Sequence, residues 1–252
     1  MPYRTLAQVG SDGTVKAGPT WNLANATSSV AGIANDKSWF YQMRRNGNAT
    51  PIRMQHACGA APSFHHFLDP AAAPSQLTLI FEDMVQAEIA AGTCEVQFGF
   101  VEHIVSTTIG DLVGVGFRAG SGTTNDWHCF VKDCPLGTTG NTVSLHDFDT
   151  GILMTDPHVL AIVIDGPTQT ISWYIDRVLV SSFTPSAVPD RMSAAANNVG
   201  PLCGVFAVVP ALGDCTVRSH AGGWPQLRIA PYPIGGEPAP SGGSRMYVSI
   251  GG

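Results

Sequence analysis

Charged residues are scarce in this sequence: Asp, Glu, Lys and Arg together make up only 13% of its 252 residues. A soluble domain usually has about twice that share, so we expect part of the surface to be covered by other protein. The formal net charge is −6, and the longest basic cluster is the pair Arg44-Arg45. Neither nucleic acid nor an anionic membrane surface is therefore an expected partner.

The sequence also lacks long apolar runs: none approaches the roughly 20 residues needed to cross a bilayer, and the N-terminus lacks the basic-then-apolar plan of a secretory signal. We therefore expect no membrane partner and synthesis in the cytoplasm. No CxxC pair occurs among the cysteines, which are Cys58, Cys94, Cys129, Cys134, Cys203 and Cys215. We expect free structural thiols, with disulfides as the alternative, and neither a metal nor another cofactor.

No segment has the apolar periodicity of an amphipathic helix longer than about two turns, whereas strand patterns recur, which predicts an all-β protein. Beyond the segment treated next, we predict strands at Trp39–Arg44, Ile52–Ala57, Cys94–Phe100, Val113–Phe117, Trp127–Lys132, Thr142–Leu145, Leu202–Val209 and Trp224–Ile229. Asn46-Gly47-Asn48 predicts that the first two form a hairpin. Gly114 and Gly116 interrupt an apolar face, as at a bulge or a close approach of two backbones.

The segment from His158 to Phe183 predicts a three-stranded antiparallel meander of a β-sandwich. An Asp165-Gly166-Pro167 turn joins its first two strands, and Asp176-Arg177 joins the last two. A two-residue loop sets a register in which Ile175 lies opposite Val178, Trp173 opposite Val180 and Ile171 opposite Ser182. We therefore predict that the core-facing side chains are Ile171, Trp173, Ile175, Val178 and Val180.

Arg177 occupies a position where such a turn favours glycine, since a type I′ turn needs a positive φ at both central residues. Either the turn type differs, or another contact offsets a strain on the order of 1 kcal/mol. We name Arg177 as a candidate partner-binding residue for this reason.

Both ends of the chain depart from the strand pattern. Residues 1–36 are rich in Gly, Ser, Asn and Thr and are predicted as an N-terminal arm with loops, residues 37–230 as the sandwich domain, and residues 231–252 as a Gly/Pro-rich linker followed by a C-terminal β arm. That arm either returns to its own sheet or is donated to a neighbouring subunit. Its candidate partner-binding residues are Met246, Tyr247, Val248 and Ile250.

Few residues are arranged for catalysis. His146-Asp147-Phe148-Asp149-Thr150-Gly151 loosely resembles a calcium loop, but it offers too few oxygens, and we expect turn capping. Glu82 and Asp83 are adjacent and point to opposite faces of a strand, and Glu95 stands alone, so a glycosidase pair of carboxylates is not expected. Trp21, Trp39 and Trp127 are candidates for stacking on a glycan, although core packing is the more common role of such tryptophans.

Several motifs resemble the concanavalin A-like lectin and glucanase jelly-roll superfamily, in the form found in structural proteins of tailed-phage virions. The sequence Gly116-Phe117-Arg118 precedes a strand with Trp127, and then come LAIVIDG from Leu160 and WYIDRVLV from Trp173. The resemblance covers about residues 75 to 230 and implies an antiparallel jelly-roll β-sandwich. Arg177 replaces a usual glycine, and neither the lectin metal loop nor the glucanase carboxylate strand is found, so no site residue is carried over.

The resemblance implies a non-enzymatic structural protein of a phage-like virion. We expect a capsid decoration, cement or head-fibre protein, located on the virion, that binds the major capsid protein or other virion proteins and forms a homo-oligomer, for example a trimer. The alternative is a glycan-binding, receptor-binding module on a tail or baseplate, with a surface glycan as partner. A polysaccharide-degrading enzyme is the third hypothesis, and it requires two carboxylates that face each other.

Overall fold

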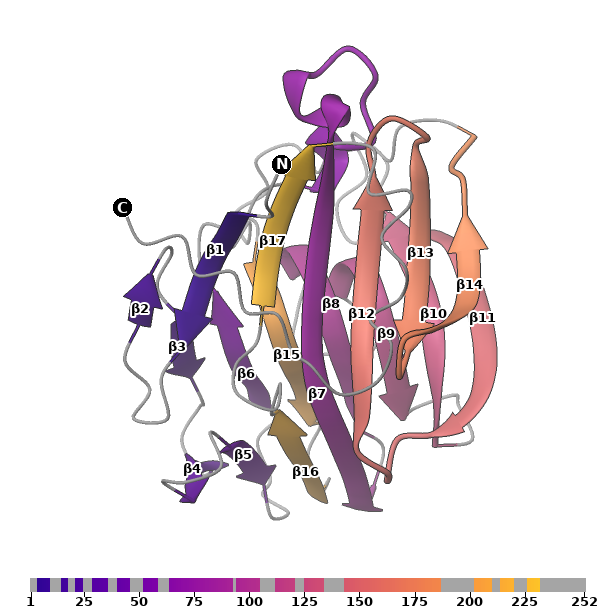
Figure 1. Ribbon diagram of the computed structural model, residues 1–252. Coiled ribbons are helices and arrows are strands. Elements are labelled where there is room, and N and C mark those ends of the chain that lie inside the picture. The colour runs from indigo at the N-terminus through magenta and orange to yellow at the C-terminus, as the bar shows by residue number, and fades with distance from the viewer. Residues whose placement is uncertain are drawn as a thin grey trace.

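The computed structural model describes residues 64–92, 94–104, 112–120, 125–133, 143–186, 202–209, 214–219 and 226–231, and the strand backbones at 4–9, 15–17, 21–24, 29–35, 40–45 and 52–58. These residues form two antiparallel sheets that face each other (Figure 1). The only helical segments among them are the short 3-10 turns Phe64–His66 and Ala73–Gln76. The predicted all-β sandwich is confirmed.

The larger sheet has ten strands in the described part of the chain. Its order is β14 (Val178–Phe183), β13 (Thr170–Ile175), β12 (His158–Asp165), β7 (Leu77–Ala91), β16 (Asp214–Ser219), β5 (Phe40–Arg45) and β4 (Ser29–Asn35), with β17 (Gln226–Pro231), β1 (Arg4–Val9) and β2 (Val15–Ala17) branching from β7. The long strand β7 pairs with β12 along one edge, and its other edge is shared by β17 and β16. This one strand therefore joins all branches of the sheet.

The smaller sheet has seven strands among the described residues. Its order is β11 (Val143–Leu153), β10 (Asp126–Asp133), β9 (Leu112–Gly120), β8 (Glu95–Ile104), β15 (Leu202–Val209), β6 (Ile52–Cys58) and β3 (Trp21–Ala24). Strands β8 to β11 follow one another in both sequence and space. The predicted hairpin at Asn46-Gly47-Asn48 is wrong, because β5 lies in the larger sheet and β6 in the smaller one.

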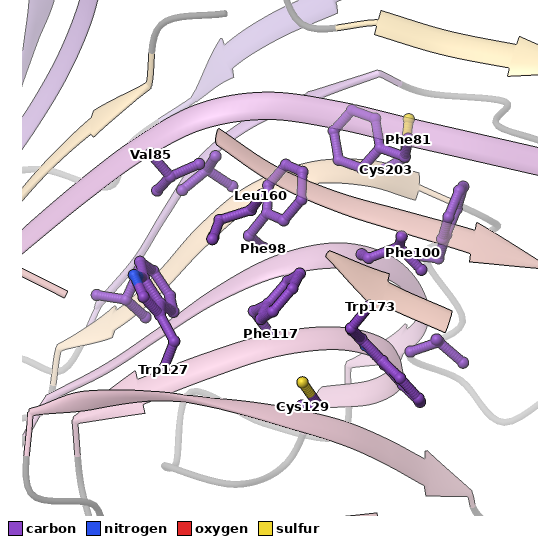
Figure 2. Close-up of a cluster of buried hydrophobic side chains, with 14 of the residues drawn as sticks. Phe81, Val85, Phe98, Phe100, Phe117, Trp127, Cys129, Leu160, Trp173 and Cys203 are labelled. Atoms are coloured by element: carbon purple, nitrogen blue, oxygen red, sulfur yellow. The ribbon is translucent and has the colours of Figure 1, made fainter. Parts of the chain in front are cut away.

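The core lies between the sheets and is rich in aromatic rings (Figure 2). Phe81 of β7 stacks on Phe98 of β8 with ring centroids 4.6 Å apart, and Phe117 of β9 meets Trp127 of β10 edge to face. Trp173 of β13 donates its indole N–H to the carbonyl oxygen of Gly116 on the opposite sheet, at 2.8 Å. Apolar packing and this directional hydrogen bond therefore both help to hold the two sheets together.

Gly114 and Gly116 lie where neighbouring backbones approach closely, as predicted. A Cβ added to Gly114 would lie 1.9 Å from the carbonyl oxygen of Phe100, and one added to Gly116 would lie 2.1 Å from that of Phe98. Because backbone atoms cannot rotate away as side-chain atoms can, strands β8 and β9 pair here only if both positions carry glycine.

The predicted meander is present as β12, β13 and β14, but its register is only partly as predicted. Ile175 pairs with Val178, whereas Trp173 pairs with Ser181 and not with Val180, because the strand is bulged between these two pairs. Ile171, Trp173 and Ile175 are buried as predicted, and Val180 is half-buried against the core. Val178 is 66% exposed, so its predicted core position is wrong. It lies on β14, the edge strand of the larger sheet.

The Asp176-Arg177 turn keeps the conformation that favours glycine. Asp176 has φ of 50° and Arg177 has φ of 70°, the two positive values of a type I′ turn. The carboxylate of Asp176 accepts hydrogen bonds from the backbone N–H of Val159 at 2.9 Å and from His158 Nδ1 at 2.7 Å. These bonds tie the turn to β12 and offset its strain. Arg177 is exposed, and its partner-binding role stays a prediction.

Strands β1 to β4 fall within residues 1–36, and the boundary between arm and sandwich stays a prediction. The arm residues Met246, Tyr247, Val248 and Ile250 lie outside the described residues. The described cysteines Cys94, Cys129, Cys203 and Cys215 are buried thiols that form no disulfide, as predicted, while Cys58 and Cys134 have no described side chains. Among the described residues no helix is long and apolar enough to cross a membrane.

Candidate functional site

A row of polar side chains crosses the outer face of the smaller sheet from β8 to β11. In the pairing registers, Gln97 lies opposite Arg118, Arg118 opposite His128, and His128 opposite Asp149. Opposed residues in antiparallel strands share a face, and the neighbours in sequence, such as Phe98, Phe117 and Cys129, point into the core. With Glu95 and Asp147, this row forms what we call the Arg118 cluster.

Arg118 lies between two carboxylates. Its Nη1 is 3.9 Å from Oε2 of Glu95, and its Nη2 donates to Oδ2 of Asp147. His128 lies beside the same group, with Nδ1 3.0 Å from Oδ1 of Asp147 and Nε2 3.7 Å from Oδ1 of Asp149. Glu95 also accepts a hydrogen bond from Nε2 of Gln97. One guanidinium thus connects a carboxylate on β8 with one on β11.

Exposure increases along the row from β8 toward β11. Glu95 and Gln97 are buried, Arg118 and His128 are half-buried, and Asp147 and Asp149 are exposed. Burial raises the pKa of Asp147, but the hydrogen bonds and charges of His128 and Arg118 outweigh this and hold the pKa below its usual value. Asp147 is therefore ionised at neutral pH, at the solvent-accessible end of the cluster.

Two polar atoms of the cluster are buried without a hydrogen-bond partner: Oε1 of Gln97 and Nε of Arg118. Since a carboxylate only accepts hydrogen bonds, the Gln97 amide must present its nitrogen to Glu95, which leaves its oxygen unpaired. A buried polar atom without a partner costs about 1–3 kcal/mol, and native proteins rarely keep one without a water or ligand to satisfy it. These two atoms therefore leave one acceptor and one donor of the cluster that a water or a hydroxyl group reaching them would pair with.

Strand β11, which carries Asp147 and Asp149, also closes the side of the sandwich. His146 of β11 stacks between Trp173 and Phe183, with ring centroids 5.1 and 5.0 Å apart, and its Nε2 hydrogen-bonds Oγ of Ser181 at 3.0 Å. All large apolar side chains that are exposed in the described part of the chain lie on β11 and β14. They form what we call the apolar edge: Val143, Leu145, Phe148, Leu153, Val178 and Leu179.

Of the predicted glycan-stacking residues, Trp127 has a described side chain. Trp127 is fully buried, with 0% of its surface exposed, so its ring offers no face to a sugar and its predicted stacking role is wrong. The side chains of Trp21 and Trp39 lie outside the described residues. Trp127 is in the core because its position in β10 alternates with the outward-facing His128.

The carboxylates considered from the sequence are also separated. Glu82 and Asp83 lie on β7 of the larger sheet, where Asp83 pairs with the core residue Leu160 and is buried, and Glu95 lies on the outer face of the other sheet. The sequence did not show that Glu95 and Asp147 both face Arg118. In the motif interpreted as a turn, Asp149 caps by accepting from the N–H of Gly151 at 2.9 Å, and Thr150 Oγ1 accepts from the N–H of Ile152 at 3.2 Å. Asp147 lies within a strand and binds Arg118.

No protein-family model matches the sequence, and no curated protein matches it. Among solved structures, a carbohydrate esterase of the Shiga toxin-encoding bacteriophage phi24B has a TM-score of 0.51 at 14% identity, covering 91% of this chain and 100% of that chain. The carbohydrate recognition domain of Emp47p has a TM-score of 0.47 at 9% identity, covering 90% and 95%. The κ-carrageenase of Pseudoalteromonas carrageenovora has a TM-score of 0.42 at 8% identity, covering 83% and 88%.

At sequence identities this low, structural similarity shows a shared fold and does not show a shared function. The likeness to the phage protein extends over nearly the whole of both chains and includes both sheets. Together with the antiparallel topology, it shows that this chain has a jelly-roll β-sandwich fold.

Proposed function

We propose that the sandwich is a non-enzymatic glycan-binding module of a phage-like virion. The observation that carries the proposal is the Arg118 cluster, in which carboxylates, a guanidinium, an imidazole and an unpaired amide oxygen share one sheet face. Sugar hydroxyls both donate and accept hydrogen bonds, so they match a surface that offers acceptors at Asp147 and Asp149 and donors at His128 and Arg118. A small set of convergent polar groups of this kind is typical of specific ligand sites.

The ionised carboxylate of Asp147 supports binding of a glycan without its cleavage. A glycosidase needs one carboxylic acid that still holds its proton near neutral pH, and this requires a raised pKa. Asp147 has a lowered pKa, and Arg118 lies between it and Glu95, in the place that a scissile bond would have to occupy. The two acidic groups that face each other therefore act as holders of Arg118 and not as an acid and a base.

A glycan array probed with the purified protein tests this function. We expect binding to at least one glycan class, and a decrease of about tenfold or more in Asp149→Asn and His128→Asn, since removing one hydrogen bond to a ligand changes affinity on the order of 1–3 kcal/mol. Asn at position 149 still caps the Gly151 turn, so the fold is preserved. Arg177→Gln, in the β13–β14 turn of the other sheet, is the control and should bind as the wild type does.

Two results would contradict the proposal. One is an array on which the folded wild type binds no glycan. The other is the release of sugar or acetyl groups from a bound glycan, with loss of this release in Asp147→Asn, since the protein would then be an enzyme.

Attachment to a capsid as a decoration or head-fibre protein is the second candidate function. The apolar edge supports it, because exposed apolar side chains that gather along two adjacent edge strands are typical of protein interfaces. In this proposal the partner is the major capsid protein or another virion protein, and the chain acts as a homo-oligomer such as a trimer. Val178→Asp should lower its occupancy on particles imaged by cryo-electron microscopy, whereas Glu88→Gln, an exposed change on β7, should not.

The C-terminal arm allows a separate test of that candidate. If residues 246–250 are donated to a neighbouring subunit, a chain lacking residues 237–252 should assemble with reduced occupancy and particle stability. Normal occupancy of the truncated chain would contradict the donated strand while leaving the apolar edge as the attachment surface.

A further inference from the structure

The Arg118 cluster has more negative than positive groups. Its three carboxylates belong to Glu95, Asp147 and Asp149, and its cations are Arg118 and, when protonated, His128. The cluster therefore carries a net negative charge in either protonation state of His128. Along the outer face of β10 the next charged groups are Asp126 and Lys132, which have opposite signs and do not change this balance.

The one permanent cation of the cluster is already held by acidic groups of the protein. Nη2 of Arg118 donates to Asp147, Nη1 faces Glu95, and the guanidinium is half-buried between them. Arginine recognises a carboxylate or sulfate through two parallel N–H donors on one edge of its planar group. In this chain those two nitrogens face Asp147 and Glu95, so an acidic ligand would have to displace a carboxylate of the protein.

The unpaired atoms favour a neutral ligand group. Oε1 of Gln97 needs a donor and Nε of Arg118 needs an acceptor, and these residues lie opposite each other in the β8–β9 register. A hydroxyl group supplies both functions, whereas a carboxylate or sulfate only accepts. The buried end of the cluster therefore matches an uncharged polyol.

From these three observations we infer that the Arg118 cluster selects glycans whose contacting sugar is uncharged and excludes acidic glycans, and that Asp147 sets this selectivity by holding Arg118. The inference rests on the proposed glycan-binding function and adds the class of ligand. Asp147 is thus a specificity-determining residue, because its carboxylate occupies the position that an acidic sugar would otherwise take.

The test compares the wild type with Asp147→Asn on an array of neutral, uronate, sialylated and sulfated glycans, followed by titration with an oligogalacturonate. We expect the wild type to bind neutral glycans only. Asp147→Asn should gain oligogalacturonate affinity on the order of three- to tenfold at low salt, and most of this gain should disappear at about 150 mM salt, since exposed charges are screened there. Asp156→Asn, an exposed change of the same charge in the β11–β12 turn, is the control and should show no gain.

Each alternative outcome has a distinct meaning. Wild-type binding to acidic glycans at an affinity equal to that for neutral ones would overturn the selectivity but leave glycan binding intact. The absence of all glycan binding would overturn the proposed function, and the selectivity with it. If Asp147→Asn does not fold, Glu95→Gln replaces it, because Glu95 is the other carboxylate that faces the Arg118 guanidinium. Glu95→Gln should show a gain of the same sign, and a folded variant with no gain would overturn the inference.

Discussion

Two buried tryptophans allow the contribution of one hydrogen bond to stability to be measured against a matched control. Trp127 and Trp173 are both 0% exposed and both lie in the same core (Figure 2). The indole N–H of Trp173 donates to Gly116 on the opposite sheet, whereas Nε1 of Trp127 is buried without a partner. Replacing each by Phe removes the same atoms from a similar apolar surrounding, so the packing cost is similar and the difference between the variants reports on the indole N–H.

Trp173→Phe loses a buried hydrogen bond with a net contribution of about 0.5–1.5 kcal/mol. Trp127→Phe removes a buried donor that lacks a partner, which recovers about 1–3 kcal/mol of desolvation penalty. Trp173→Phe should therefore be less stable than Trp127→Phe by about 1.5–4.5 kcal/mol. For a chain of this size that difference lowers Tm by at least about 3 °C.

Urea denaturation followed by far-UV circular dichroism is the suitable assay, because both variants change the tryptophan fluorescence itself. The free energy of unfolding is compared at equal m-values, so that a change in the denatured state is not mistaken for one in the core. Equal stabilities of the two variants, within about 0.5 kcal/mol, would refute the reasoning, since the Trp173–Gly116 bond would then contribute nothing that the unpaired Trp127 lacks.

Three further predictions concern the turn, the edge and the thiols. Asp176→Ala should lower the free energy of unfolding by about 1–2 kcal/mol in urea because the N–H of Val159 loses its acceptor, and Asp176→Asn should lower it less. Burial holds the pKa of His146 below its usual value despite the nearby Asp147. As the pH falls, His146 is therefore protonated in the unfolded chain before it is protonated in the folded one, and this favours unfolding. Tm should fall as the pH drops below about 6.5, and it should fall less in His146→Phe. Burial raises the pKa of the Cys129 thiol, so it should react with Ellman's reagent only in denaturant.

The meander shows how far local sequence rules reach. Alternation of apolar residues and the Asp176-Arg177 turn predicted its strands, its antiparallel pairing and the burial of Trp173. The exposure of Val178 could not be predicted in this way, because it depends on β14 being the edge of the sheet and on a bulge that shifts the register. Both are set by which strands pair at long range, and two-residue periodicity contains no information about that.

The candidate site was only partly visible for the same reason. Glu95 was found but interpreted as isolated, Arg118 was interpreted as part of a fold motif, and Asp147 was assigned to a turn. Their alignment follows from three successive registers between β8, β9, β10 and β11. A signal was present, since each of these strands carries a polar residue at an outward position, but the loops between them leave the registers undefined until the strands are paired.

Strand β11 has two roles that depend on each other. In the described part of the chain it pairs only with β10, so its position relies on side chains as well as on its backbone ladder. On its outer face Asp147 is bound by Arg118 and His128, and on its inner face His146 is stacked between Trp173 and Phe183. Weakening the interactions on either face loosens the strand that carries the exposed carboxylates of the Arg118 cluster. Ligand affinity and the stability of this edge should therefore fall together when His146 is replaced, although His146 lies on the face away from the ligand.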